Sequence, residues 1–237
     1  MRAPPTPDHP RFAPVADGGL LVEFGEAISD DAHRAVLALD QALARDPPAG
    51  IGEAVPAYAS LLVTFDPVVT DHPAVEQALR RLLTRRAETP HPPALHEVAV
   101  CYDDDLSPDL AEVARQTGLD PTAVIAAHLA GDYRVYMYGF APGYAYLAGV
   151  PPALRLDRKP AAVRGVAAGS VLIAGPQCII STLTMPSGWW IIGRSPTAIL
   201  LPDPARPFLF DVGDRVQFRR IGRAVHEAAL ADRVRHG

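Results

Sequence analysis

The sequence predicts an α+β protein in which a small α/β N-terminal domain is followed by a β-barrel domain. Strands and helices alternate before the proline cluster Pro90–Pro93, whereas short apolar strands predominate after it. The cluster predicts a linker, because proline has no backbone N–H to donate and restricts the residue before it. We therefore expect domains at residues 16–90 and 94–222. Residues 1–15 are expected to be disordered, and residues 223–237 to form a tail or a short helix.

The predicted N-terminal domain alternates strand, helix, strand and helix. Ser29-Asp30 offers a helix N-cap, and Ala35, Leu39 and Leu43 recur at the spacing of one helix face. The second strand is a continuous apolar run closed by Asp66-Pro67. In order, the elements are a strand at Leu20–Phe24, a helix at Ala32–Ala44, a strand at Tyr58–Phe65 and a helix from His72 to about Arg86.

The predicted second domain begins with one strand and two helices and continues as short strands cut by glycine and proline. Several short strands without intervening helices are typical of a closed or nearly closed barrel. Gly118 is the expected stop of the first helix. The elements are a strand at Glu97–Tyr102, helices at Leu106–Gly118 and Pro121–Ala130, and strands at Tyr133–Tyr138, Ser170–Ala174, Trp189–Ile192, Ala198–Leu201 and Arg215–Phe218.

Composition and charge exclude several classes of function. The net charge is −5, and no basic cluster of the kind that binds nucleic acid stands out. No apolar run approaches the ~20 residues that span a bilayer, and the N-terminus is Pro-rich rather than apolar. Cys101 and Cys178 have neither zinc nor redox spacing and are expected to be free, buried thiols. We therefore expect a soluble cytoplasmic protein with no nucleic-acid or membrane partner.

The most distinctive stretch is the loop from Gly139 to Tyr144. Gly139 and Gly143 bracket Phe140 and Pro142, and Tyr144 follows directly. Glycine allows positive φ and close backbone approach, while proline makes the turn rigid. Such a loop can present backbone N–H groups to a ligand between aromatic walls, so these five residues are candidate ligand-binding residues. The alternative is a tight barrel turn with aromatic side chains in the core.

Two later stretches carry further candidates. Gln177 follows a predicted strand, and its amide offers a donor and an acceptor; the alternative is a glutamine that caps a loop. Arg194 ends the next strand and is a candidate partner for a carboxylate or phosphate; the alternative is a surface salt bridge. Trp189 and Trp190 must point to opposite faces of a strand. One is therefore expected in the core and the other exposed or at an interface.

Four cations lie in a loop broken by proline and glycine. Loops carry binding sites more often than scaffold elements do. An anion-binding loop and a solvated connector are both consistent with this pattern. The cations are Arg155, Arg158, Lys159 and Arg164.

The residues assign no catalytic group, metal site or cofactor. His128 lies on a predicted helix, where a lone histidine is typical of packing. The run Asp103–Asp105 lacks the alternating ligand spacing of a calcium loop. Neither a GxSxG elbow nor a phosphate-binding GK[ST] sequence occurs.

Several stretches, in this order, are similar to one known family. Together they identify the chain as a member of the family that contains the B subunit of 5-oxoprolinase, KipI and allophanate hydrolase subunit 1. The resemblance runs from about Gly18 to Ile221 and implies a small α/β domain followed by a cyclophilin-like β-barrel. The stretches are VPAYASLLVTFDP (Val55–Pro67), VYMYGFAPGYAYLAGVP (Val135–Pro151), AAGSVLIAGPQ (Ala167–Gln177), PSGWWIIGRSP (Pro186–Pro196) and VGDRVQF (Val212–Phe218).

The resemblance also implies a function and partners. In bacterial 5-oxoprolinase, three different subunits together open 5-oxoproline to glutamate with ATP. The implied partners of this chain are a C-type subunit similar to allophanate hydrolase subunit 2 and a LamB/YcsF-type A subunit. ATP is implied for the holoenzyme only, since this chain has no ATP motif. The alternatives are an allophanate- or urea-type amidohydrolase–carboxyltransferase system, a KipI-like inhibitor of a sensor histidine kinase, and a catalytically silent interaction subunit.

The chain departs from the family pattern at several positions. Arg158 fits the arginine of the family's TPR motif, whereas Arg164 is displaced by one position from the next motif arginine. Cys178 stands where the family has threonine, and Ser187 stands where a glycine usually precedes Gly188. These departures fall in the region that the resemblance implies faces the ligand.

Overall fold

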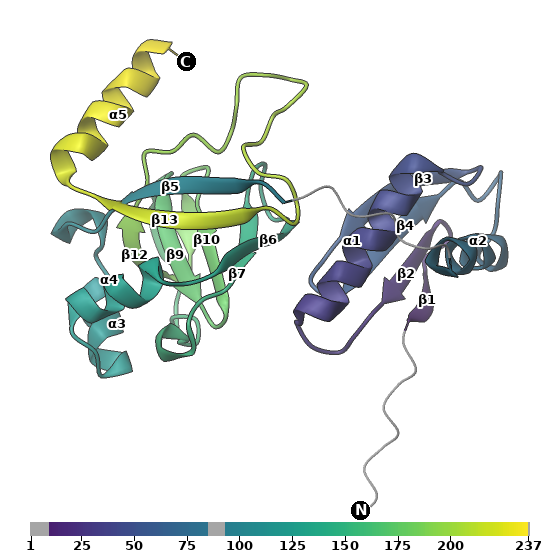
Figure 1. The fold of residues 1–237 in the computed structure, drawn as a ribbon, viewed down its shortest axis with the longest axis horizontal. Coiled ribbons are helices and arrows are strands. Elements are labelled where there is room, and N and C mark those ends of the chain that lie inside the picture. The colour runs from purple at the N-terminus through teal and green to yellow at the C-terminus, as the bar shows by residue number, and fades with distance from the viewer. Residues whose placement is uncertain (1–9, 85–92, 237) are drawn as a thin grey trace, which may run out of the picture. The chain divides into compact units, whose positions relative to one another are not determined.

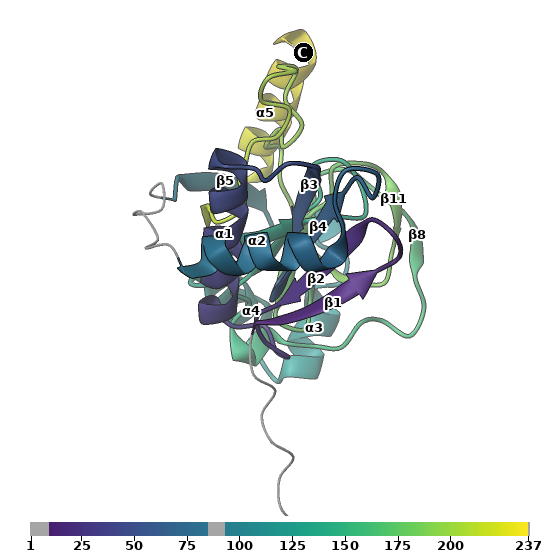
Figure 2. The same ribbon diagram turned by 90° about the vertical axis from the view of Figure 1, so that its right-hand side faces the viewer.

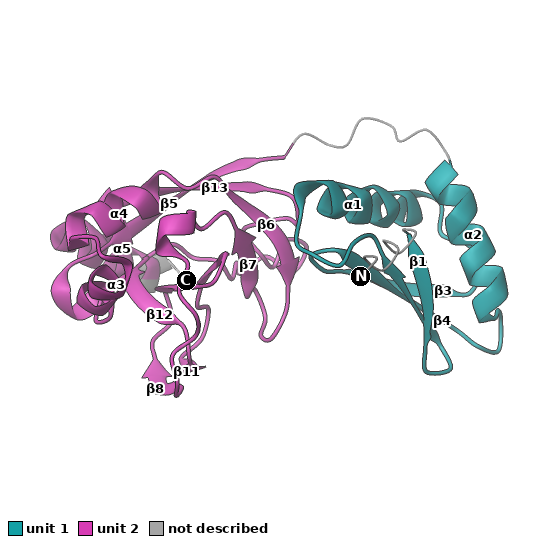
Figure 3. Ribbon diagram, turned by 90° about the horizontal axis from the view of Figure 1, so that it is seen from below, with its two compact units in different colours: residues 1–92 teal, residues 93–237 magenta. Residues whose placement is uncertain are grey.

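The structure is a computed structural model that describes residues 10–84 and 93–236. The chain divides into two compact units, residues 1–92 and residues 93–237 (Figure 3). The linker predicted at Pro90–Pro93 includes this division, although residues 90–92 lie outside the described residues. Helices and strands are mixed, and one sheet closes into a barrel, so the predicted α+β class is confirmed.

Unit 1 is a four-stranded sheet with two helices packed on it (Figure 1). The strand order is β1-β2-β4-β3, and every neighbouring pair is antiparallel. Helix α1 packs on β3 and β4, whereas α2 packs on β2. The elements are β1 (Arg11–Val15), β2 (Gly19–Glu23), α1 (Asp30–Arg45), β3 (Ile51–Pro56), β4 (Ser60–Phe65) and α2 (His72–Thr84).

The core of unit 1 follows from the periodicity of its strands and helices. Every second residue of β4 is buried, so one face of the sheet is apolar. Leu39 and Leu43 of α1 lie on one helix face and pack on that sheet face. The helix begins at the predicted N-cap, where the hydroxyl of Ser29 accepts a hydrogen bond from the backbone N–H of Ala32 at 3.2 Å. The cap satisfies one of the N–H groups that the first helical turn leaves without a partner.

The sequence does not predict the two edge strands of unit 1. β1 pairs with β2 from Arg11 to Val15, so the prediction of disorder is wrong for residues 11–15. Residues 1–9 lie outside the described residues. β1 contains Pro14, which an edge strand tolerates because one of its sides needs no backbone donor. β3 carries a register shift between Ile51 and Ala54, and this irregularity hides its alternation.

Unit 2 contains a closed barrel of seven strands, which confirms the predicted barrel. Their order around the barrel is β10-β7-β6-β13-β5-β12-β9. β13 runs parallel to β5, and the remaining pairs are antiparallel. β8 and β11 form a separate two-stranded sheet (Figure 2). The strands are β5 (Leu95–Cys101), β6 (Tyr133–Tyr138), β7 (Ala145–Ala148), β8 (Val163–Val166), β9 (Ser170–Ala174), β10 (Gln177–Ile180), β11 (Met185–Ser187), β12 (Trp190–Arg194) and β13 (Arg215–Ile221).

Helices α3 and α4 share one hydrophobic core with the barrel interior. The helix predicted at Leu106–Gly118 begins only at Leu110, because proline keeps the residue before it out of the helical conformation. Ser107, which precedes Pro108, has φ −133° and ψ 54°. Gly118, with φ 71°, ends the helix as predicted. The elements are η1 (Asp104–Leu106), α3 (Leu110–Thr117), α4 (Pro121–Leu129), η2 (Pro152–Leu154) and α5 (Arg223–His236), which projects beyond the barrel (Figure 1).

The short strands are the elements that the sequence predicts least well. β7, β8, β10 and β11 have three or four residues each, too few for an alternating pattern to stand out. The prediction of a strand at Ala198–Leu201 is wrong. That segment folds back on residues 207–209 and makes one isolated bridge, between Leu200 and Phe208. Its apolar residues pack without joining the barrel sheet.

The side chain of Asp214 links the beginning of β13 to the beginning of β5 by hydrogen bonds. Its carboxylate accepts hydrogen bonds from the backbone N–H groups of Ala94 and Asp211, both at 2.9 Å. The same carboxylate lies 2.7 Å from Nε2 of His96. Asp214 is 6% exposed, so these bonds form away from water, where an unpaired carboxylate is costly. They set the start of the parallel β5–β13 pair.

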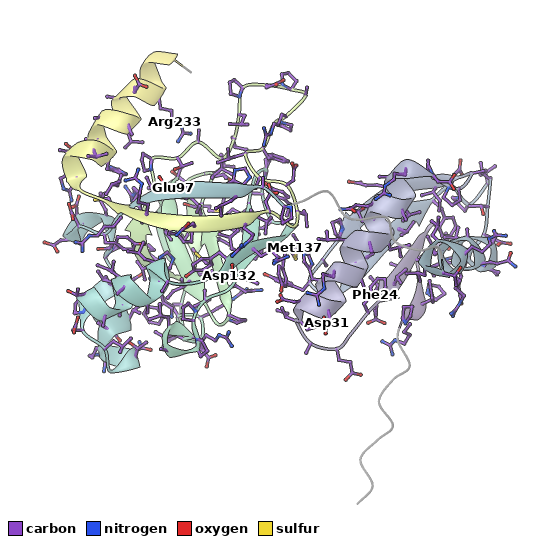
Figure 4. All side chains as sticks on the ribbon, viewed as in Figure 1. Phe24, Asp31, Glu97, Asp132, Met137 and Arg233 are labelled. Carbon is purple, nitrogen blue, oxygen red and sulfur yellow. The ribbon has the colours of Figure 1, made fainter. Side chains whose placement is uncertain are left out.

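Surface ion pairs also connect β13 with its neighbours. Arg215 of β13 donates to Asp132, before β6, at 2.8 Å, and Arg219 donates to Glu97 of β5 at 2.6 Å. Figure 4 labels the two carboxylate residues. Both pairs are exposed, and exposed pairs contribute less than about 1 kcal/mol each. The buried Asp214 is therefore the stronger determinant of this register.

A buried polar cluster occupies the barrel core. Nδ1 of His128 lies 2.8 Å from the Tyr102 hydroxyl, and its Nε2 lies 3.7 Å from Sγ of Cys178. All three side chains are at most 3% exposed. Burial lowers the pKa of His128 to about 3 and raises that of the Cys178 thiol. The imidazole and the thiol are therefore both neutral at pH 7. Cys178 and Cys101 are free and buried, as predicted.

We expect the stability of unit 2 to fall as the pH drops below about 6.5. The pKa of His128 is about 3 in the folded chain, so between these values only the unfolded chain binds the proton. This group alone then contributes a loss of about 1.4 kcal/mol per pH unit. Both tryptophans, Trp189 and Trp190, lie in unit 2, so denaturation followed by their fluorescence reports this unit.

The His128→Gln variant should show a smaller loss of stability between pH 6.5 and 4.5. Tyr102→Phe is the control, because it removes the hydroxyl beside the imidazole and leaves the titrating group. That variant should be less stable at every pH by about 1–3 kcal/mol, with an unchanged pH slope. An equal pH slope in wild type and His128→Gln would show that His128 does not cause the loss of stability.

Candidate functional site

The loop Gly139–Tyr144 connects β6 to β7 as a compact, hydrogen-bonded turn. The backbone N–H of Gly139 donates to the carbonyl of Tyr144 at 3.2 Å, and that of Tyr144 donates to Ala141 at 3.0 Å. Gly143 has φ +68°, the left-handed conformation in which glycine is favoured. Thr182 donates its hydroxyl hydrogen to the carbonyl of Pro142 at 2.8 Å, so a neighbouring turn holds the loop.

Phe140 is the strained residue of this loop. Its φ is +70°, which is rare for a residue with a bulky side chain, and its side chain is 75% exposed. An exposed apolar ring obtains little stability from burial, so burial does not offset the strain. Strained residues are enriched at ligand and partner sites. Phe140 therefore remains a candidate for a contact that this chain makes with another molecule.

Four aromatic rings connect this loop to the beginning of β12, and we call them the aromatic ladder. The ring centroids of Phe140 and Tyr144 are 5.5 Å apart, those of Tyr144 and Tyr146 5.8 Å, and those of Tyr146 and Trp189 5.9 Å. The guanidinium carbon of Arg158 lies 5.6 Å from the Trp189 centroid. These distances suit aromatic pairing and a cation–π contact. Tyr144 and Trp189 are buried and Tyr146 is half-buried, whereas Phe140 at one end of the ladder and Arg158 beside Trp189 at the other are exposed.

The adjacent tryptophans lie in two different hydrophobic clusters. Trp190 points into the barrel core, and Trp189 points outward into a second cluster with Tyr144 and Leu172. They are 7% and 5% exposed, so the expectation that one would be exposed or at an interface is wrong. The sequence argument assumed one core, whereas unit 2 has an apolar cluster on each side of β12.

The loop that carries Arg158 is fixed to β12 by several contacts. The indole Nε1 of Trp190 donates to the carbonyl of Asp157 at 2.7 Å, and the backbone N–H of Lys159 donates to Gly188 at 2.7 Å. The ammonium of Lys159 lies 2.5 Å from the carboxylate of Asp109, which also accepts from the N–H of Ile191. Lys159 is therefore a structural residue. The ordered loop leaves the exposed Arg158 at its surface.

A pocket of about 400 Å³ opens between α3 and this loop. This volume lies within the usual range of small-molecule sites. Two arginines and one aspartate give the lining a net positive charge. The lining residues are Gln116, Arg155, Leu156, Asp157, Arg158, Pro160 and Trp190.

Gln177 and Arg194 do not join the ladder or the pocket lining. Gln177 opens β10 beside the turn in which the N–H of Gly175 donates to Leu156, so it lies next to the Arg158 loop. Arg194 ends β12, roughly 13 Å along the strand from Trp190. Among the described residues its buried Nε has no hydrogen-bond partner.

Arg194 instead belongs to a charged cluster at the base of α5. Its charge helps to lower the pKa values of Asp105 and His226. The main cause for Asp105 is its hydrogen bond with Arg223, and the main cause for His226 is burial. This cluster connects α5 to the barrel, so Arg194 lies among residues with a structural role.

Sequence reasoning missed several residues that the structure places with the candidates. Tyr146 lies in the predicted motif, but alternation alone did not show that its ring connects Tyr144 to Trp189. Gln116 and Arg155 line the pocket with Arg158 although they are 39 positions apart in the sequence (155 − 116). Sequence reasoning named Arg155 only as one of four cations in a loop that was either anion-binding or a solvated connector. No local pattern points to Gln116.

The groups gathered at the candidate site are of kinds that bind anions and apolar rings. The ladder and the pocket offer aromatic, guanidinium and amide groups, and burial raises the pKa of Tyr144 to about 12. The neighbouring histidine and thiol, His128 and Cys178, are sealed in the core. Within residues 10–84 and 93–236, no group of three or more metal-ligating side chains occurs. In the described part of the chain, no helix is long and apolar enough to span a membrane.

Comparison with known proteins defines the class to which this fold belongs. The model of the carboxyltransferase domain, subdomain C and D, matches residues 10–210. The chain belongs to this family. Its curated relatives include the B subunit of 5-oxoprolinase from Bacillus subtilis (strain 168), which is 34% identical over 90% of this chain and 94% of the relative. The B subunit of 5-oxoprolinase from Escherichia coli O157:H7 is 32% identical over 86% of this chain and 93% of the relative.

Solved structures show the same fold. TTHA0988 is 42% identical with a TM-score of 0.75, and the match covers 86% of this chain but 40% of the longer TTHA0988 chain. The urea carboxylase of Kluyveromyces lactis is 18% identical with a TM-score of 0.76, over 96% of this chain and 23% of the enzyme. At that identity the likeness concerns the fold alone.

The strain at Phe140 predicts an unusual order of stabilities. Phe140→Ala and Phe140→Gly both remove the ring and its contact with Tyr144, but only glycine adopts φ +70° without strain. Phe140→Gly should therefore be more stable than Phe140→Ala by about 1 kcal/mol, in urea denaturation followed by tryptophan fluorescence. A more stable alanine variant would show that the loop relaxes out of this conformation.

Gly143 should be intolerant of a side chain for two reasons. An added Cβ would lie 2.6 Å from Cδ2 of Leu200, and φ is +68°. Gly165→Ala is a matched control, since Gly165 has φ +69° and open space around the added carbon. The control should lose about 1 kcal/mol of stability and Gly143→Ala about 2 kcal/mol or more. Equal losses in denaturant titrations would mean that Leu200 moves aside freely.

Proposed function

We propose that this chain is the B-type subunit of an ATP-dependent 5-oxoprolinase, which opens 5-oxoproline to glutamate. The observation that carries the proposal is the alignment with the B. subtilis B subunit of 5-oxoprolinase over 90% of this chain and 94% of that relative, at 34% identity. The two proteins therefore share nearly their whole length. A similar alignment with the E. coli O157:H7 protein supports the same assignment.

The proposed complex contains two further subunits. One is a C-type subunit homologous to this chain and similar to allophanate hydrolase subunit 2, and the other is a LamB/YcsF-type A subunit. The relatives are each named as one subunit of an enzyme, which supports an assembly with other subunits. We place ATP on the complex rather than on this chain, which has no GK[ST] phosphate-binding sequence.

The proposed contribution of this chain is to bind and position the substrate or the partner through the ends of the aromatic ladder. Phe140 presents an exposed ring on a strained loop, and Arg158 presents a guanidinium on an ordered loop. Arginine suits the carboxylate of 5-oxoproline because its planar fork matches the two oxygens. Arg194 is left out of this proposal, since it lies in the cluster at the base of α5.

The proposal predicts ATP-dependent formation of glutamate when the three subunits are purified together. In that complex Phe140→Ala, Tyr144→Ala and Arg158→Ala should each lower kcat/KM at least tenfold, about 1.4 kcal/mol of transition-state binding. Circular dichroism should show an intact fold for each variant. Arg219→Ala is the control, because it removes an exposed cation of β13 that pairs with Glu97.

Two outcomes would count against the proposal in different ways. A stable complex that releases no glutamate from 5-oxoproline with ATP would exclude this reaction. Full activity in all three site variants would leave the reaction standing and would place its site elsewhere.

A further inference from the structure

The pocket between α3 and the 155–160 loop combines groups that none of the sequence motifs brings together. Arg155 and Arg158 come from the loop, Gln116 from the last turn of α3, and Trp190 from the start of β12. Three separate segments thus converge on one cavity of about 400 Å³. Because the loop is fixed to β12, the cavity is a built feature of unit 2 rather than a gap beside a loose segment.

The two guanidinium groups are available to an anion. The Nε of Arg155 donates a hydrogen bond to the carbonyl of Val150 at 3.0 Å, which orients the side chain. Its two terminal nitrogens are left to bind a ligand. Within the described residues, Arg158 makes no hydrogen bond or ion pair, and its guanidinium carbon lies 5.6 Å from the Trp189 ring centroid. Lys159, which follows Arg158 in the chain, is paired with Asp109. Asp157 offsets one of the two arginine charges, so the lining stays positive.

The remaining lining groups suit a small ring that carries an amide. The side-chain nitrogen of Gln116 donates to Glu112 at 2.7 Å, so its carbonyl oxygen is left to accept a hydrogen bond. Trp190, which is 7% exposed, lines the pocket with Leu156 and Pro160, and these three side chains give the lining its apolar part. A ligand with a carboxylate, a compact apolar ring and an N–H donor would satisfy all three kinds of group.

We propose that this pocket binds the carboxylate of a small cyclic organic acid, held by Arg155 and Arg158, with its ring against Trp190 and its N–H donated to Gln116. Only the choice of 5-oxoproline as that acid rests on the proposed function. Arg155 and Gln116 become substrate-binding residues, and the acid lies in the pocket at the Arg158 end of the aromatic ladder.

The test is direct binding to the full chain without partner subunits, measured by calorimetry at millimolar ligand. Three probes separate the groups: 5-oxoproline, 2-pyrrolidinone, which has the same ring without the carboxylate, and cyclopentanecarboxylate, which lacks the amide. We expect 5-oxoproline to bind saturably and 2-pyrrolidinone at least tenfold more weakly. Cyclopentanecarboxylate should fall between them, since it loses the contact with Gln116.

The variants assign the binding to this pocket. Arg155→Gln and Arg158→Gln should each weaken 5-oxoproline at least tenfold, whereas Arg164→Gln, the same change on β8 outside the lining, should leave the affinity unchanged. Arg158→Gln breaks no hydrogen bond in the described structure, so it tests the pocket even if Arg155→Gln perturbs the loop. Unchanged affinity in Arg158→Gln, or no saturable binding of either carboxylate, overturns the inference.

Two outcomes distinguish an error in this inference from an error in the proposed function. If the chain binds 5-oxoproline through Arg158 but the assembled complex forms no glutamate, the pocket stands and the reaction is wrong. If the complex forms glutamate while the chain binds neither carboxylate, the reaction stands and the pocket is wrong.

Discussion

The alternation of side chains along β12 is the constraint on which the architecture of unit 2 depends. Trp189 directly precedes β12 and Trp190 begins it, and the two side chains lie in clusters on opposite sides of the strand. Trp190 fills the barrel core, and Trp189 begins a second apolar cluster outside it. Each indole is then approached by one of two adjacent cations, Arg158 at 5.6 Å and Lys159 at 5.4 Å. One strand thereby organises the barrel core, the aromatic ladder and the loop that lines the pocket.

Polar groups in unit 2 fall into two sets with different roles. Those inside the barrel, His128 and Cys178 among them, are kept neutral by burial and contribute to a packed core. Those on the outside, such as Arg155 and Arg158, are exposed. Judged by the distance alone, a histidine nitrogen 3.7 Å from a thiol sulfur would suggest a catalytic pair. Burial decides against it, because a nucleophilic thiolate needs a lowered pKa and access to substrate.

Strain and exposure coincide at Phe140, and this coincidence has a cost in stability. A glycine would fit φ +70° without strain, yet the chain carries a large ring there, mostly in contact with water. The fold holds the loop in place through Thr182 and Leu200, which lie close to Gly143 within the loop. The barrel thus provides the rigidity that keeps an unfavourable conformation populated, a pattern common at sites that meet another molecule.

The sequence by itself determined the class of the fold, the longer elements and the family. Apolar periodicity and an N-cap predicted α1, and glycine predicted the end of α3, because these signals are local. Only the tertiary structure decided that Gln116, Arg155 and Arg158 line one pocket, that Arg194 belongs with α5, and that both tryptophans are buried. Each of these depends on barrel closure, which joins segments far apart in the chain and creates a second apolar surface. The short strands and edge strands were not predicted for a related reason. Each is defined by its pairing with a neighbouring strand, and its own residues show no clear alternating pattern.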